Sequence, residues 1–181
     1  MRLRRRAMAV ILASLFLVAG LHPSEALAIG DSTGPWAIGI YEFPSCLEVQ
    51  GGSTANSAQV QLWSCDETKS HRTWYMEEVA TGWWHIKNTK SGKCLNVKGA
   101  STNEGAKIIQ YTCQSTSKHN DQWQLLDSGV SGYNGELYTL HNRKSGLCLN
   151  AQGASTANGT DLIQYECGGW WNNFFTWWPA R

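Results

Sequence analysis

From residue 36 onward, apolar and polar residues alternate in short runs, the period-two pattern of β-strands that are buried on one face. Turn residues such as Ser91-Gly92 and Ser145-Gly146 separate neighbouring runs at hairpin spacing. No window after residue 28 has the 3.6-residue period of an amphipathic helix. The pattern therefore predicts an all-β protein. The predicted strands include 36–40, 60–63, 84–86, 108–111, 137–140 and 162–165.

One sequence repeat occurs three times along the chain, and each copy contains two cysteines nineteen positions apart. Three such short units cannot each bury a core, whereas three units packed around a shared axis can. We therefore expect one closed all-β domain over 36–181, preceded by a short segment, 29–35. The repeats are expected at about 36–79, 80–127 and 128–181. A glycine-rich insertion over 127–135 predicts a longer hairpin loop in this region.

All six cysteines belong to this framework, and no Cys-x-x-Cys pair is present. Six cysteines allow fifteen pairings, and sequence alone does not choose among them. The equal spacing favours one disulfide inside each repeat, and bridges between repeats are the alternative. The predicted pairs are Cys46–Cys65, Cys94–Cys113 and Cys148–Cys167. Because all six cysteines are predicted to form disulfides and the acidic residues are scattered along the chain, we expect no metal site and no cofactor.

The first 28 residues have the three parts of a secretory signal peptide. Four arginines lie within residues 2–6, an apolar run follows over 8–21, and Ala26-Leu27-Ala28 is a small-x-small cleavage site. An uncleaved membrane anchor is the alternative, but the run is short for a span. We expect an extracellular protein without membrane insertion. Without residues 1–28, which hold four arginines and one glutamate, the formal charge changes from +1 to −2, which argues against nucleic-acid binding.

Polar and aromatic residues recur at fixed offsets from the cysteines. A polar residue stands two positions after the first cysteine of each pair, and an aromatic residue two positions before the second. A polar loop follows. Together a ring face and nearby hydrogen-bonding groups suit a pyranose, whose C–H face stacks while its hydroxyls need donors and acceptors. The candidates are Glu48, Trp63, His71 and Arg72; Asn96, Tyr111, Asn120 and Asp121; and Asn150, Tyr165, Asn172 and Asn173.

The motifs Cys-Leu-x-Val/Ala, Gly-Ala-Ser-Thr and Ile/Leu-Gln-Trp/Tyr-x-Cys resemble those of the ricin B-type lectins, also described as family 13 carbohydrate-binding modules. The resemblance covers about residues 36–178. It implies a β-trefoil with three pseudo-threefold repeats and up to three shallow sugar sites. It also implies that the first polar residue of each repeat accepts bonds from sugar hydroxyls, that the ring stacks, and that Gln61 adds a contact in the first repeat. The closing aromatics, expected in the core, are Trp74, Trp123 and Phe175.

The chain departs from this family pattern at each site. The family's acidic residue is replaced by the longer Glu48 and by the neutral Asn96 and Asn150, which give up charge-assisted bonds. The Gln position of the family's Gln-x-Trp motif is occupied by Arg72, Asp121 and Asn173. We therefore expect the third-repeat site to be the best preserved, then the second, then the first, although the first keeps tryptophan as its ring.

Structural explanations compete with each assignment. The three rings can pack in the barrel, Asn96 and Asn150 can bond their own backbone in turns, and His71 can be a solvated loop residue. The stretch 168–178 holds six aromatic residues, more than one core needs. Trp170 and Trp171 can widen the third sugar platform, pack against Trp83 and Trp84, or form a patch for a partner.

These observations predict a secreted, monomeric, non-enzymatic lectin that binds galactose-type glycans or xylan-like polysaccharide through several weak sites. An enzyme is disfavoured because the repeats occupy the chain after residue 35 and no HExxH, GxSxG or P-loop motif is present. The alternative is a trefoil scaffold that binds a protein partner, as an inhibitor or a toxin's delivery subunit.

Overall fold

Twelve β-strands, four from each repeat, make up the described part of the chain. The computed structural model describes residues 34–41, 43–114, 117–132 and 135–180, which belong to one unit spanning Asp31–Arg181. The predicted signal peptide and most of segment 29–35 lie outside the described residues. The strands are β1 (Trp36–Ile40), β2 (Ser45–Val49), β3 (Val60–Ser64), β4 (Thr73–Ala80), β5 (Trp83–Asn88), β6 (Cys94–Val97), β7 (Ile108–Tyr111), β8 (Trp123–Gly132), β9 (Gly135–Asn142), β10 (Cys148–Ala151), β11 (Leu162–Tyr165) and β12 (Phe175–Pro179).

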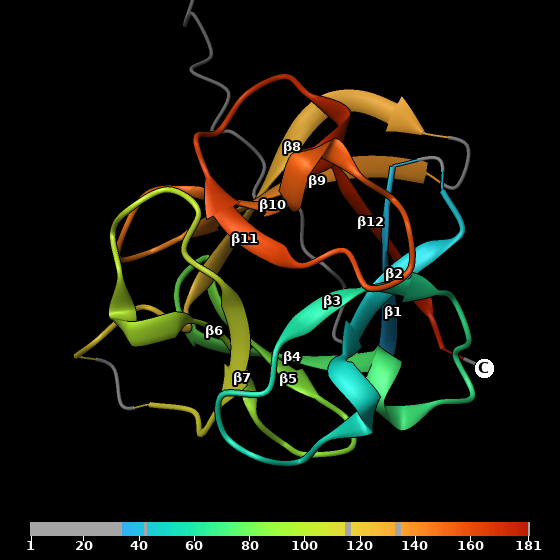
Figure 1. Cartoon of the computed structure of the whole chain (residues 1–181). Helices are drawn as coiled ribbons and strands as arrows, with labels where there is room; N and C mark the ends of the chain where they lie inside the picture. The colour runs from blue at the N-terminus through green and yellow to red at the C-terminus, as the bar shows by residue number, and fades with distance from the viewer. Residues whose placement is uncertain (1–33, 42, 115–116, 133–134, 181) are drawn as a thin grey trace, which may run out of the picture. The chain divides into compact units, whose positions relative to one another are not determined.

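Six of these strands close into an antiparallel barrel. β1 pairs with β4 and β12, β5 pairs with β4 and β8, and β9 pairs with β8 and β12. The other six form three hairpins, β2–β3, β6–β7 and β10–β11. Figure 1 shows these hairpins as three sectors around a common centre, with β3, β7 and β11 nearest to it. A barrel capped by three hairpins is the β-trefoil that the repeats predicted.

The strands that the alternating pattern predicted are all present, and the helices are short. Within the described residues the helices are five 3-10 turns of three residues each, and none could reach across a membrane. They are η1 (Gln50–Gly52), η2 (Ser70–Arg72), η3 (Lys98–Ala100), η4 (Gln152–Ala154) and η5 (Trp171–Asn173). The insertion predicted over 127–135 lengthens the β8–β9 hairpin, in which β8 continues to Gly132 with a bulge after Asp127.

The core repeats with the same threefold symmetry. Each repeat contributes equivalent side chains that are fully buried, which is how three short units share one apolar interior. These sets are Leu47, Leu95 and Leu149; Val60, Ile108 and Leu162; and Trp74, Trp123 and Phe175. The prediction that the closing aromatics belong to the core is confirmed. Two of them also satisfy buried carbonyls, because the Trp74 and Trp123 indoles donate to the backbone oxygens of Leu47 and Leu95.

The disulfides confirm one bridge inside each repeat. Cys46–Cys65, Cys94–Cys113 and Cys148–Cys167 each join the first strand of one cap hairpin to the segment just after its second strand, with Cα atoms 5.0 Å apart. Each bridge therefore fixes the first polar position of its repeat near the ring two residues before the second cysteine. This is the juxtaposition on which the candidate sites depend.

Buried glutamines join neighbouring repeats at the centre of the cap. The Gln110 side-chain amide donates to the Ser53 and Ala55 carbonyls of the first repeat, both at 2.9 Å. Gln164 makes the same pair of bonds to the second repeat, through Ser101 and Asn103. The first repeat has Leu62 at this position, where backbone bonds to Gly159 and Thr160 and bonds from Ser64 to the Asn158 side chain join it to the third repeat. The glutamines therefore fix how the hairpins meet.

Candidate functional site

In the second and third repeats, the predicted polar residues are brought together as asparagine pairs. The Asn120 Nδ2 donates to the Asn96 Oδ1 at 3.0 Å, and the Asn172 Nδ2 donates to the Asn150 Oδ1 at the same distance. In each pair the loop asparagine also donates to a backbone carbonyl of the neighbouring strand. The strand asparagines are thus bonded to the site loop rather than to their own turn. The sequence offsets singled out all four residues as site candidates, and the structure brings them together in pairs.

These strand asparagines are nearly closed to solvent. Asn96 is 2% exposed and Asn150 is 3% exposed. Their Nδ2 atoms are buried without a hydrogen-bond partner among the described residues. Because the Oδ1 of each already accepts a bond and each side chain is nearly closed to solvent, neither presents an open acceptor. Their role as sugar contacts stays a prediction.

The first repeat is built differently around Glu48. The Glu48 Oε1 accepts a bond from the Gln61 Nε2 at 3.0 Å, and the Oε2 accepts one from the Arg72 Nε at 2.5 Å. The His71 Nε2 lies 3.6 Å from the same Oε2. The Glu48 side chain is only 4% exposed, so this carboxylate is a buried anion held by a cation and an amide.

An open cavity of about 460 Å³ lies over this group. Five of the residues that line it were singled out from the sequence: Glu48, Gln61, Trp63, His71 and Arg72. Gly159 of the third repeat also lines it. The cavity therefore combines a ring face with polar groups, as a saccharide site requires. The expected order of the sites remains untested, but this geometry favours the first repeat.

The three predicted stacking rings all reach the surface to some extent. Tyr165 is 40% exposed, and Trp63 and Tyr111 are half-buried. A second hollow, of about 340 Å³, borders Tyr111 on the side of Gln114 and Lys118. The rings are therefore not part of the barrel core. Whether they stack on a sugar stays a prediction.

The second loop position of each pair points inward in the second and third repeats. Asp121 and Asn173 have no exposed surface. The Asp121 Oδ2 accepts a bond from the Gln114 backbone N–H at 2.7 Å, and its Oδ1 lies 3.5 Å from the His85 Nε2. At the equivalent position of the first repeat, Arg72 instead lines the cavity. A direct sugar contact from Asp121 or Asn173 stays a prediction that their burial does not favour.

Sequence reasoning missed two buried asparagines that hold the site loops. The Asn88 Nδ2 donates to the His71 carbonyl, and the Asn142 Nδ2 donates to the Asn120 carbonyl, both at 3.1 Å. A recurring Asn-x-Lys-Ser-Gly motif six residues before the cysteine marks both positions. At the equivalent position the first repeat has Ile40, which has no side-chain amide. The site loop of the third repeat is instead held by a backbone bond from the Tyr41 N–H to the Phe174 carbonyl.

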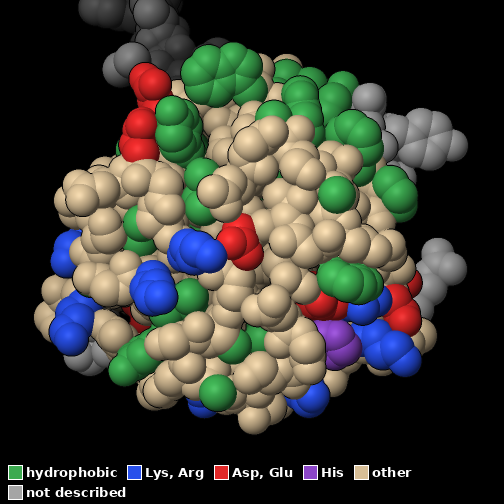
Figure 2. All heavy atoms as spheres, viewed as in Figure 1, with side chains coloured by type: hydrophobic (Ala, Val, Ile, Leu, Met, Phe, Trp, Pro, Cys, Tyr) green, Lys and Arg blue, Asp and Glu red, His purple; other side chains and the backbone are tan. Residues whose placement is uncertain are grey.

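The charges around the first cavity set the protonation of His71. Burial lowers the pKa of His71 below its ordinary value of 6.5, and the nearby cations Arg72, Lys90 and Lys69 lower it further. The Glu48 carboxylate opposes this shift but does not cancel it. His71 is therefore neutral at pH 7. On the face shown in Figure 2, acidic and basic side chains gather beside a histidine.

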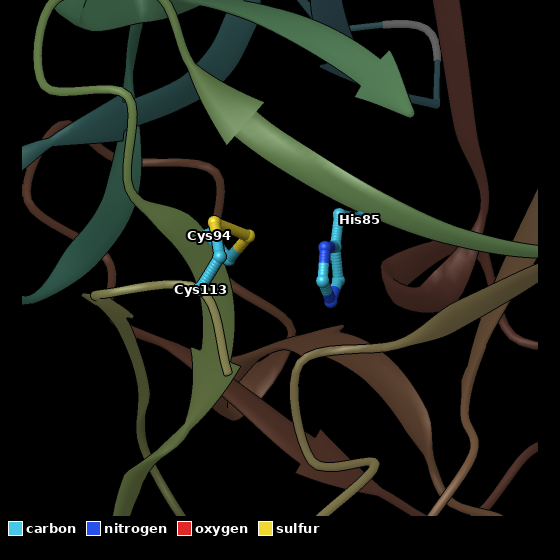
Figure 3. A group of neighbouring side chains, drawn as sticks. All are labelled: His85, Cys94 and Cys113. Atoms are coloured by element: carbon cyan, nitrogen blue, oxygen red, sulfur yellow. A yellow bond between two sulfur atoms is a disulfide. The ribbon is translucent and has the colours of Figure 1, made fainter. Parts of the chain in front are cut away.

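Two clusters, each of one histidine and two cysteines, have the composition of a metal-binding site. His85 lies against Cys94–Cys113, as Figure 3 shows, and His141 has the same relation to Cys148–Cys167. In both groups the two sulfurs are bonded to each other. Bonded sulfurs offer no thiolate, which is the form of cysteine that binds metal ions. These groups are therefore disulfides packed against an imidazole.

The C-terminal aromatics are used mainly for packing. Trp171 contacts Phe43 with ring centroids 5.2 Å apart, and Trp177 stacks on Tyr138 at 4.8 Å. Trp170 is 55% exposed, and its ring rests against the backbone of Gly168. Because Trp170 is exposed, two of the alternatives for this stretch remain: Trp170 can widen the third sugar platform, or it can belong to a patch that binds a partner.

Comparison with known proteins defines the class of protein. The family model described as ricin-type β-trefoil lectin domain-like matches residues 32–111, 71–165 and 119–180, which together span the described chain. The chain therefore belongs to the ricin-type β-trefoil lectin family. No curated protein sequence matches it.

Solved structures agree with this family. A designed threefold-symmetric protein, ThreeFoil, is 30% identical with a TM-score of 0.72, over 78% of this chain and 96% of its own. An exo-β-1,3-galactanase from Clostridium thermocellum is 28% identical with a TM-score of 0.72, and the match covers 81% of this chain but only 30% of the enzyme. The Rhizoctonia solani agglutinin shares the fold at 15% identity, with a TM-score of 0.67 over 82% of this chain and 96% of its own. Family and neighbours together support a carbohydrate-binding role.

Proposed function

We propose that this chain is a secreted, monomeric and non-catalytic lectin that binds galactose-type glycans or xylan-like polysaccharide. The observation that carries the proposal is the first-repeat cavity, where the Trp63 ring shares one hollow with Gln61, Arg72 and the buried Glu48. Galactose-type ligands are supported by the likeness to part of a galactanase. The non-catalytic assignment is supported by Glu48, whose two carboxylate oxygens are both bonded within the protein.

The three repeats favour multivalent recognition of a polymer. One pyranose buries little surface, so we expect a dissociation constant on the order of 0.1–1 mM for each site. Sites displayed on one rigid trefoil raise the overall affinity for a repeating polysaccharide without any new contact. Polymers should therefore bind far more tightly than the sugars that compose them.

Retention on immobilised glycans and polysaccharides tests this proposal. The variant Trp63→Ala/Tyr111→Ala/Tyr165→Ala removes all three rings and should abolish retention. Tyr75→Ala is the matched control, since Tyr75 is an exposed aromatic on β4 at 38% exposure, outside the predicted sites. Thermal unfolding of each variant checks that the fold survives.

Two outcomes would contradict the proposal. Retention that is unchanged in the triple variant would place binding elsewhere, and Trp170 would then be the first surface to test for a protein partner. Release of reducing sugar from a bound polysaccharide by the purified protein would show that it is an enzyme.

A further inference from the structure

The Arg72 guanidinium supplies N–H donors to the lining of the first-repeat cavity. Both oxygens of Glu48 are already engaged, by Gln61 and Arg72, and the carboxylate is almost closed to solvent. Arg72 has five N–H donors, of which its Nε bonds Glu48 and its Nη1 bonds the Ser64 carbonyl at 3.1 Å. No hydrogen bond from its Nη2 to a described residue is present. The end of the guanidinium, Nη1 and Nη2 together, therefore keeps free N–H groups beside the cavity.

Two further cations, Lys69 and Lys90, lie close enough to the cavity to act electrostatically on His71, together with Arg72. The Lys90 Nζ donates to the Gly52 carbonyl at 2.5 Å, which places this cation beside the η1 turn. At the position of Arg72, the second and third repeats carry the buried Asp121 and Asn173. A ligand anion would therefore meet a guanidinium at this loop position only in the first repeat.

We propose that the first-repeat cavity binds a saccharide through an anionic substituent, a uronic-acid carboxylate, held by the free end of the Arg72 guanidinium while the sugar ring stacks on Trp63. The inference rests on the proposed carbohydrate-binding function and names the ligand class of its first site. Glu48 then acts as a positioning residue, because its bond to Nε orients the guanidinium and its charge is already neutralised.

A carboxylate fits this arrangement better than a sulfate. The guanidinium is a planar fork whose two parallel N–H groups match the two oxygens of a carboxylate. Uronic acids occur as substituents or backbone units of galactose-type and xylan-like polysaccharides alike, so the inference is compatible with either polymer. A sulfated sugar shares the charge but not the planar geometry, and it therefore serves as a separate arm of the test.

Isothermal titration with D-galacturonic acid and its uncharged methyl ester tests the inference at pH 7. The two ligands differ in one charge and one methyl group, and galactose and galactose 6-sulfate complete the set. We expect the dissociation constant of the acid to be on the order of tenfold lower than that of the ester, since hydrogen bonds to a charged partner are stronger. The sulfate should fall between them.

Two variants locate the effect. Glu48→Gln/Arg72→Gln removes both charges of the pair together and should bring the ratio between ester and acid to about one. Lys98→Gln is the matched control, because Lys98 is an exposed cation of the second repeat at a position where the other repeats carry Gln50 and Gln152. It should keep the full ratio. If the double variant fails to fold, the indole N–H resonance of Trp63 in the wild type reports whether the acid enters this cavity.

The outcomes separate this inference from the proposed function. Equal affinity for the acid, the ester and galactose in the wild type would overturn the inference and leave a neutral-sugar lectin. A preference for the acid that persists in the double variant, or an acid that leaves the Trp63 resonance unmoved, would also overturn it. A protein that binds none of these ligands and no polysaccharide would refute the lectin function itself.

Discussion

Replacing Arg72 by glutamine should destabilise the protein, because it leaves the buried Glu48 carboxylate without its cation. The Glu48 side chain is 4% exposed, and the Arg72 Nε is its nearest cation, at 2.5 Å. Breaking a buried ion pair by removing one partner costs about 3–5 kcal/mol. Because the Arg72 side chain is 15% exposed and the cavity above it is open, we place the loss of unfolding free energy near the lower end, at about 3 kcal/mol. The double variant Glu48→Gln/Arg72→Gln should lose less than about 1 kcal/mol, since no charge is left unpaired.

Urea unfolding followed by circular dichroism measures both variants. At pH 8, His71 is neutral because its pKa is lowered by burial, so it does not replace the lost cation. Removing Arg72 raises the pKa of His71 toward its ordinary value, and a protonated His71 3.6 Å from the carboxylate can then replace it. The penalty of Arg72→Gln should therefore shrink between pH 8 and pH 5.5. A single variant within about 0.5 kcal/mol of the wild type at pH 8, or a double variant no more stable than the single one, would refute this reasoning.

Three further stability predictions follow from contacts outside the cavity, all measured by urea unfolding. Cys94→Ala/Cys113→Ala should cost about 3 kcal/mol, because the bridge closes a loop with a sequence separation of 19; a loss below about 1 kcal/mol would contradict it. Gln110→Leu, which copies the first repeat, should cost about 2 kcal/mol by leaving two carbonyls unpaired, and an unchanged midpoint would show that water replaces it. Asp161→Asn should cost less than about 1 kcal/mol, since its partner Lys107 is 50% exposed, and a larger loss would reveal an unexpected role in the cap.

Much of the fold could be predicted because the chain repeats. Equal cysteine spacing predicted the three bridges, since three like units are wired alike. Equal offsets from those cysteines singled out Asn96, Asn120, Asn150 and Asn172, which the structure joins in two pairs. The same comparison could have identified Gln110 and Gln164, which recur three residues before the second cysteine where the first repeat has Leu62. Their burial indicates a structural role rather than a sugar contact.

The first site could not be predicted in the same way because it departs from the repeat. Its sequence has a glutamate, Glu48, where the family pattern has an acidic aspartate, and an arginine, Arg72, where it has a glutamine. From sequence alone, these two departures predict a poorly preserved site. The structure joins the two departures into one ion pair, since Glu48 on β2 accepts a bond from the Nε of Arg72 in the η2 turn. Such a pairing depends on side-chain conformations and on the distance between a strand and a loop 24 residues apart, neither of which an offset from a cysteine encodes.

The indole N–H resonance of Trp63, followed by nuclear magnetic resonance while saccharides are added, tests the central claim most directly. Trp63 lines the first cavity, whereas Trp74 and Trp123 are fully buried and serve as internal references. The account predicts a saturable shift of Trp63 with galacturonic acid while the two references stay still. A Trp63 resonance that does not move with any saccharide, in a protein that is folded by the same spectrum, would contradict it.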